Sequence, residues 1–196
     1  MADRAYGARS ALAAFAAVPV LAAPALAEPV NFAPHRAVYE ITLARSTAGS
    51  GVSDMTGRMV YELTGSICEG FTQNMRFVTR SSNAEGAETI NDLRTSSWEE
   101  LAGKRLRFSS TQYQNDAIAE ASQGDASRDR SADSAGDLAV TNVDLTRPAK
   151  KRVKMLGDVY FPMQHASALI EAARAGKTLF PANLYDGSEK GEKYYA

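Results

Sequence analysis

Long runs in which apolar and polar residues alternate, joined by short turns, constrain the fold of this chain most strongly. In the first run, Ala37, Tyr39, Ile41 and Leu43 share one face of an extended strand. The same pattern predicts further strands at about residues 54–63, 71–80, 88–98 and 105–113. Long strands joined by short turns form an antiparallel meander with one buried face. We therefore predict a mostly β fold.

The side chains on the two faces of this sheet differ in kind. The apolar face carries aromatic residues and methionines: Tyr39, Phe77, Phe108, Met59 and Met75. We expect these residues, and Met163 of the helix predicted below, to fill the core rather than to contact a ligand. The other face is rich in serine, threonine, asparagine, glutamine and arginine, which is typical of a solvated sheet surface. The sequence alone assigns no residue to the lining of a binding site.

The second half of the chain is less regular. Residues 117–122 are expected to continue the sheet, whereas 123–136, small, polar and charged, predict an exposed, mobile loop. Short strands are expected at 138–143 and 152–156. The basic residues 150–152 between them indicate a solvated turn more strongly than a site for an anionic partner.

One helix is predicted to begin at Pro162, where the first turn tolerates proline, and to stop at Gly176. Its apolar residues recur at helical spacing and form one stripe: Met163, Ala166, Leu169, Ile170 and Ala173. An extended segment at 178–184, a turn at 185–187 and the beginning of a strand at 192–196 are expected to follow. Because the chain ends within that pattern, we expect the domain to be incomplete at its C-terminus.

The first 27 residues predict a secretory signal peptide. A basic start carrying Arg4 and Arg9 precedes a short apolar segment at 11–21 and the small-residue site at 25–27. Cleavage is expected between Ala27 and Glu28, which leaves residues 28–196 as a single β-rich domain. The apolar segment is too short, and too interrupted by proline, to span a bilayer stably.

Charge and hydropathy limit the partners of the exported chain. The formal net charge of the sequence is −1, which gives neither the basic footprint of a nucleic-acid-binding protein nor a polybasic attraction to anionic membranes. No apolar segment after residue 27 is long enough to cross a membrane. We therefore expect no nucleic-acid partner and no integral membrane segment, and we expect the chain to be soluble in the compartment to which it is exported.

The single cysteine, Cys68, is unusual in an exported protein. The residues alone leave four interpretations: a buried thiol, which is the commonest state of an unpaired cysteine, an intermolecular bridge, a reactive nucleophile, or half of a bridge whose partner is missing. A nucleophile would need a histidine and an acid nearby, and His35 and His165 are the only histidines.

Other catalytic patterns are absent from the sequence. Two separate histidines and one cysteine do not supply a structural zinc site, and no nucleophile elbow or phosphate-binding glycine loop is present. Adjacent acids such as Glu99 and Glu100 are expected at a solvated hairpin. We therefore predict no catalytic residue, no metal and no cofactor, and a protein that is not an enzyme.

Four short segments, taken in order, resemble the EipB family of periplasmic proteins of alphaproteobacteria. They are Ala33-Pro34-His35-Arg36-Ala37-Val38-Tyr39, Trp98-Glu99, Phe161-Pro162-Met163-Gln164-His165 and Leu184-Tyr185-Asp186-Gly187-Ser188. The resemblance implies a curved antiparallel sheet that wraps around a helix, called a β-spiral. It also implies a disulfide from Cys68 to a second cysteine that this sequence does not contain. The family is longer than this chain, so the resemblance implies the N-terminal part of a longer domain.

The resemblance also implies a role in the integrity of the cell envelope, without enzymatic activity. The leading hypothesis is a periplasmic protein whose concave sheet face binds an apolar or amphipathic peptide, a lipid or a partner protein. The alternative is a carrier of lipoproteins or lipids. A less favoured hypothesis is an envelope hydrolase that uses His35 or His165 with a nearby acid.

Overall fold

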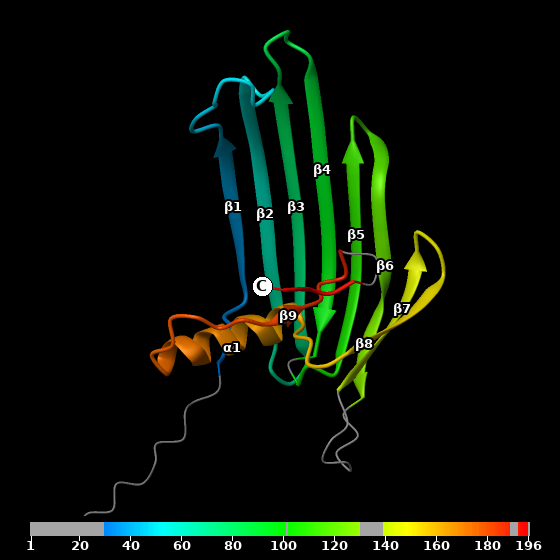
Figure 1. The fold of residues 1–196 in the computed structure, drawn as a ribbon. Coiled ribbons are helices and arrows are strands. Elements are labelled where there is room, and N and C mark those ends of the chain that lie inside the picture. The colour runs from blue at the N-terminus through cyan, green and yellow to red at the C-terminus, as the bar shows by residue number, and fades with distance from the viewer. Residues whose placement is uncertain (1–29, 101, 130–138, 189–191, 196) are drawn as a thin grey trace, which may run out of the picture.

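A computed structural model describes residues 30–100, 102–129, 139–188 and 192–195 of the chain. Eight antiparallel strands form one curved sheet, and one helix lies across an end of it (Figure 1). The sheet strands are β1 (His35–Thr42), β2 (Asp54–Ser66), β3 (Gly70–Ser82), β4 (Glu88–Glu99), β5 (Arg105–Gln114), β6 (Ala117–Asp129), β7 (Val140–Arg147) and β8 (Lys151–Leu156). They are followed by α1 (Pro162–Arg174), β9 (Asn183–Leu184) and β10 (Tyr194–Tyr195).

The strand order in the sheet is the order in the chain, from β1 to β8. Each strand is antiparallel to its neighbours, as the alternating pattern predicts. The register aligns Tyr39 of β1 with Met59 of β2, Met59 with Phe77 of β3, and Phe77 with Leu93 of β4. Because side chains on paired positions point to the same face, these four residues form one row across the concave face.

The hydrophobic core lies at the end of the sheet where α1 begins. A cluster over β5 to β8 contains Leu106, Phe108, Ala126, Val143, Leu145, Met155, Val159, Phe161 and Tyr185. A smaller cluster joins Leu63, Phe71 and Met163, with Phe32 and Tyr61 packed against it. Phe108 and Met163 are therefore core residues, as expected. Tyr39 is not, because its side chain is 48% exposed on the outermost strand β1.

The prediction of a mobile loop at 123–136 is wrong for residues 123–129, which form the second half of β6. Residues 130–136 lie outside the described part of the chain. The inward positions of β6 carry the buried residues Ser122, Gly124 and Ala126. A β-carbon on Gly124 would lie 3.0 Å from Cζ of Phe108, so the small side chains are required by a close approach rather than by exposure.

The helix begins and ends close to the predicted residues. Pro162 occupies its first turn, and Gly176, with a positive φ of 74°, follows its last residue, Arg174. The predicted apolar stripe is only partly buried. Met163 is 3% exposed, whereas Leu169 and Ile170 are 43% and 38% exposed. The first turn of α1 therefore packs on the sheet, while Leu169 and Ile170 farther along reach solvent and Ala172 is buried.

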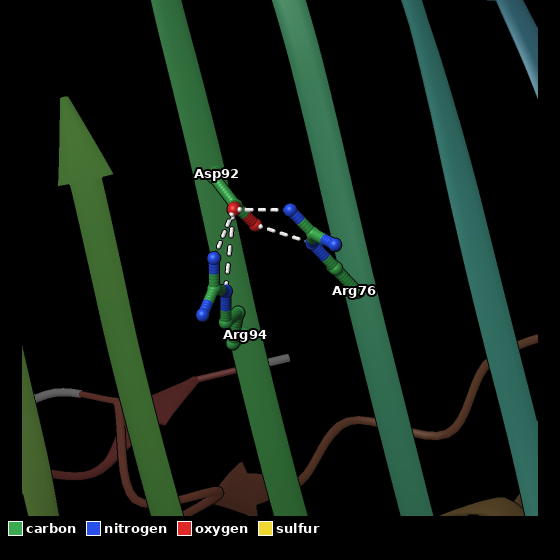
Figure 2. A network of polar contacts seen from close by, with 3 residues as sticks. All are labelled: Arg76, Asp92 and Arg94. Atoms are coloured by element: carbon green, nitrogen blue, oxygen red, sulfur yellow. Dashed lines mark hydrogen bonds and ion pairs between the residues drawn. The ribbon is translucent and has the colours of Figure 1, made fainter. Parts of the chain in front are cut away.

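The convex face of the sheet, opposite α1, carries ion pairs between neighbouring strands. Figure 2 shows the carboxylate of Asp92 between the guanidinium groups of Arg76 and Arg94. Asp92 Oδ2 accepts from Nη2 of Arg76 at 2.8 Å and from Nη2 of Arg94 at 2.7 Å. The Arg94 guanidinium also lies 4.7 Å from the centre of the Tyr113 ring. This face is the solvated surface that the sequence predicts.

The predicted signal peptide, its cleavage between Ala27 and Glu28, and the last residue of the predicted 192–196 strand lie outside the described residues. Within the described ranges, the one helix is too short and too polar to cross a bilayer.

Candidate functional site

Glu99, the last residue of β4, joins the sheet to the start of α1. Its Oε2 accepts the backbone N–H of Met163 at 2.7 Å, and its Oε1 accepts that of Gln164 at 2.8 Å. These two N–H groups lie in the first turn of the helix, where no intrahelical acceptor is available. A carboxylate also suits the positive end of the helix dipole. Glu99 thus acts as a helix cap supplied by a distant strand.

Glu99 is fully buried, and this burial changes its acidity. Loss of solvent raises the pKa of Glu99 to about 7, while the two backbone donors and the charge of Arg128 act in the opposite direction. Arg128 Nη1 donates to Oε1 of Gln164 at 3.1 Å, and its guanidinium lies 5.0 Å from the ring centre of Phe161. The start of the helix is therefore held by polar contacts from both β4 and β6.

The segment 184–188 forms a wall beside the core. Tyr185 is fully buried and its ring meets Phe108 edge to face at 5.6 Å. Gly187 has a positive φ of 90° and lies against the ring of Phe108, where a β-carbon would overlap it. Asp186 accepts from the backbone N–H of Ser188 at 2.9 Å and from the Tyr194 hydroxyl at 3.1 Å. These contacts fix the segment over the concave face.

A cavity of about 520 Å³ lies between this segment and the concave face of β2 to β6. In Figure 1 the C-terminal segment, drawn in red, crosses in front of these strands. The volume is within the range of small-molecule sites. The lining includes hydroxyl and amide side chains from several strands: Gln73, Thr95, Ser97, Ser110, Gln112 and Ser122. Its apolar lining comes from Met75, Leu93, Phe108, Pro162 and Leu184.

The cavity continues into an apolar row on the concave face. Leu93 belongs both to the cavity lining and to the row of Tyr39, Met59 and Phe77 described above. Met59, Phe77 and Leu93 are half-buried, and Tyr39 is exposed. A cavity with both polar and apolar lining that adjoins a partly exposed apolar surface provides complementary contacts for an amphipathic ligand.

The comparisons with known proteins identify the family of this chain. The EipB-like family matches residues 26–196 of the sequence. The chain belongs to the EipB-like family. The cell envelope integrity protein EipB of Brucella abortus (strain 2308) is 36% identical to it over 174 residues, which are 89% of this chain and 59% of that protein.

A solved structure shows the same fold as this EipB-like chain. The crystal structure of a β-barrel-like protein from Brucella abortus matches it with a TM-score of 0.73 and 36% identity, over 83% of this chain and 64% of the solved chain. This chain therefore spans less than two thirds of the length of these relatives.

The four segments that carry the EipB resemblance meet at the end of the sheet where α1 begins. His35 lies 5.6 Å from the ring of Tyr61, and Phe32, just before the first segment, packs on Phe71. Glu99 of the second segment caps the helix that the third segment begins. The fourth segment packs on Phe108. The motifs of the EipB-like sequence thus build one core and one wall of the cavity.

The histidines singled out from the sequence lie in different settings. His35 is exposed, and its Nδ1 lies 2.9 Å from the carbonyl oxygen of Ala33. His165 lies in α1 with its ring 6.2 Å from that of Tyr160 and 6.1 Å from that of Phe180. Neither residue lines the cavity. No acidic side chain contacts either ring in the described part of the chain, so the geometry gives no support to a hydrolase centred on them.

The interpretation of Cys68 as a buried thiol is wrong. Cys68 lies in the turn between β2 and β3 and is exposed. The side chains around it are those of Glu69, Trp98, Glu100, Lys104 and Arg105, with no histidine among them. Its pairing with a second cysteine stays a prediction from the family resemblance.

The expectation that Glu99 is solvated is also wrong. Its neighbour Glu100 is half-buried, whereas Glu99 is completely buried under the helix. The burial of Glu99 could have been predicted from its position in the alternating pattern of the strand. Glu99 follows Leu93, Thr95 and Ser97 at steps of two and therefore points to the inner face. An ionisable residue at such a position needs a partner within the fold.

The described residues bring no catalytic set together. They contain no group of three or more histidine, cysteine, aspartate or glutamate side chains placed to hold a metal ion. The cavity offers neutral hydrogen-bonding groups, apolar contacts and carboxylates, which can bind and orient a ligand.

Proposed function

We propose that this chain supports the integrity of the cell envelope from the periplasm by binding an amphipathic segment on its concave face. The sequence similarity to the cell envelope integrity protein EipB supports the role in the envelope. The predicted signal peptide supports the periplasmic location. The observation that carries the binding proposal is the continuity of the hydroxyl-lined cavity with the apolar row through Leu93. A ligand with one polar and one apolar part would match both surfaces.

The binding is expected to be non-enzymatic. Hydrophobic contact with the row would supply affinity, at roughly 25 cal/mol for each Å² of apolar surface removed from water. Hydrogen bonds from Gln73, Thr95 and Ser110 would select the polar part and fix its orientation. The same surfaces would suit a carrier of lipids, which is the alternative function. A lipid that can be extracted from the purified protein and identified by mass spectrometry would favour the carrier.

A pair of threonine variants tests the proposal. Thr95 lies on the cavity floor and Thr111 lies on the opposite face of the sheet, on the neighbouring strand. In Thr95→Trp the cavity is filled, whereas Thr111→Trp adds the same bulk outside it. Folding of both variants is checked by circular dichroism and thermal unfolding.

Binding of short dansyl-labelled peptides that alternate leucine with a polar residue is then measured by fluorescence. In parallel, a strain that lacks the gene is complemented with each variant and challenged with detergent. We expect Thr95→Trp to lose both peptide binding and complementation, and Thr111→Trp to keep both. Equal behaviour of the two folded variants would contradict a role for the cavity.

A further inference from the structure

The outer edge of β1 presents backbone groups that no other strand contacts. Within the described residues, β1 pairs only with β2. The N–H of Leu43 donates to the carbonyl oxygen of Met55, in the same register that pairs β1 with β2. Because hydrogen-bonded positions alternate along an antiparallel strand, Arg36, Val38 and Glu40 direct their backbone N–H and C=O groups to the open side.

The two edges of the sheet differ in their protection against a further strand. The edge strand β8 carries Lys151, Arg152 and Lys154 and no acidic side chain, and charges of one sign discourage pairing at an edge. β1 instead exposes Val38 and Tyr39, whose side chains are 50% and 48% exposed. An eight-residue edge strand with exposed apolar side chains is a surface on which another strand can pair.

The convex side chains of β1 are complementary to their own reversed order. When two copies of β1 pair antiparallel with Val38 opposite Val38, Arg36 of each copy lies opposite Glu40 of the other. Moving the centre by one residue places Arg36 opposite Val38 or Thr42. Moving it by two residues places like charges together, because Arg36 or Glu40 then lies opposite its own copy. The charges therefore favour a single register, in which the three outward backbone positions pair with one another.

Glu40 has room for a second guanidinium group in this register. Its Oε1 accepts from Nε of Arg58 at 2.7 Å, and the ion pair with Nη2 of Arg58 uses the same oxygen. No donor contacts Oε2 in the part of the chain that the structure describes. The guanidinium of Arg36 from a second copy would therefore give Glu40 two basic partners. This is the arrangement of Figure 2, in which one carboxylate on the same face accepts from two guanidinium groups.

We propose that two copies of this chain pair through β1 into a symmetric dimer with one continuous sheet. Val38 lies at the twofold axis, so each contact occurs twice, as in a closed dimer of identical subunits. On the concave side, Tyr39 of each copy lies opposite Ala37 of the other, which covers a ring that is exposed in the single chain. Because paired positions share a face, the concave faces of the two copies join on one side of the sheet.

Sedimentation velocity of the purified protein over a range of concentrations tests the dimer. A reductant is present throughout, so that a disulfide between two exposed Cys68 thiols cannot produce it. We expect a reversible equilibrium between monomer and dimer that shifts towards monomer as salt increases. A wild-type protein that stays monomeric at about 0.1 mM would overturn the inference.

Charge reversals test the register. Arg36→Glu and Glu40→Arg each place two pairs of like charges across the interface, so each should weaken dimerisation at least about tenfold. An equal mixture of the two variants restores both opposite-charge pairs. Heterodimers should therefore form at concentrations where neither variant dimerises alone. Arg107→Glu is the matched control, because it makes the same charge change on the convex face of β5, where Arg107 is exposed, and it should leave dimerisation unchanged.

Val38→Pro tests the backbone pairing independently of charge. The N–H of Val38 points away from β2, so proline removes a hydrogen bond of the interface and none of the β1–β2 pairing. We expect this variant to keep its circular dichroism spectrum and to lose the dimer. A dimer that survives Val38→Pro and both charge reversals, or a mixture that dimerises no better than its components, would place the interface elsewhere and overturn the inference.

The dimer and the proposed ligand binding can fail separately. No residue of β1 is among those that line the cavity in the described part of the chain. Loss of peptide binding in Thr95→Trp with an intact dimer would therefore support both proposals. A monomer that binds the peptide would overturn the dimer and leave the binding function standing.

Discussion

Glu99 and Gln164 are separated by 65 residues in the chain, and a hydrogen bond of 2.8 Å joins the carboxylate of the first to the backbone N–H of the second. Together with the bond from Met163, this contact fixes the position of α1 on the sheet. The wall of the cavity includes Pro162 at the start of that helix. A single buried side chain therefore links the stability of the fold to the shape of the candidate site.

Removal of the Glu99 side chain is expected to destabilise the protein strongly. In Glu99→Ala, two backbone N–H groups at the start of α1 lose their acceptor in a buried setting, and Arg128 loses a nearby negative charge. We expect the free energy of unfolding to fall by about 2–4 kcal/mol. Urea denaturation followed by circular dichroism measures this change. The control is Glu88→Ala on the exposed start of β4, which should change stability by less than about 0.5 kcal/mol.

The raised pKa of Glu99 predicts a dependence of stability on pH. The pKa is about 7 in the folded protein against an ordinary value of 4.5, so the folded state binds the proton more tightly than the unfolded state. This proton-binding preference contributes fully to the free energy of unfolding below about pH 4.5, and the contribution is lost as the pH rises through 7. The loss is roughly 3 kcal/mol at most. Glu99→Gln removes the titrating group. Between pH 5 and pH 8, the free energy of unfolding should fall less in this variant than in the wild type. Equal decreases in the two proteins would show that Glu99 is not the group responsible.

Substitution of Gly187 is expected to disturb the wall of the cavity. In Gly187→Ala, the new methyl group overlaps the ring of Phe108, and the positive φ adds backbone strain. We expect a loss of about 2–4 kcal/mol in unfolding free energy. Gly86→Ala is a matched control, because Gly86 also has a positive φ of 82° but nothing lies near its missing β-carbon. It should cost about 1 kcal/mol. Equal losses would show that backbone strain alone is responsible.

The ion pairs on the convex face predict a second, opposite dependence on pH. Hydrogen bonds from Arg76 and Arg94 lower the pKa of Asp92 to about 2. The stabilisation is present above the ordinary pKa of 3.8 and is lost as the pH falls through 2. Because both arginines are more than half exposed, we expect Asp92→Asn to lower stability at pH 7 by only about 1 kcal/mol.

The neighbouring pair Glu40 and Arg58 provides the comparison for Asp92. Both of its side chains are 64% exposed, so Glu40→Gln should change stability by less than about 0.5 kcal/mol. The difference between wild type and Asp92→Asn should also narrow as the pH falls from about 4 through 2, where the carboxyl becomes protonated first in the unfolded state and then in the folded state. A constant difference across this range, measured by thermal unfolding, would contradict the charge-based explanation.

The exposure of Cys68 predicts the behaviour of its thiol in the chain described here. Iodoacetamide should alkylate it in the native protein without denaturant, with little change in melting temperature. Intact mass before and after labelling measures the reaction, with and without prior reduction. Labelling that occurs only after reduction would show that Cys68 is bridged to a thiol outside this sequence and would contradict a free thiol.

The sequence by itself determined the strands β1 to β5, their order and both ends of the helix. Alternation of apolar and polar residues is a local signal, and it places β1 to β5 within a few residues of their observed bounds. Pro162 and Gly176 determine the ends of α1 through their backbone preferences. Because short turns join these long strands, consecutive strands pair with each other and form a sequential antiparallel sheet.

Only the tertiary structure decided which side chains those elements bury. The small inward residues Ser122, Gly124 and Ala126 give no hydrophobic signal, because their burial depends on residues of neighbouring strands, as the close approach of Gly124 to the Asp144 carbonyl and to Phe108 illustrates. Leu169 carries a strong apolar signal and is nevertheless 43% exposed. The cap formed by Glu99 and the cavity that Asp186 closes depend on groups brought together from distant parts of the chain. A local pattern contains no information about such distances.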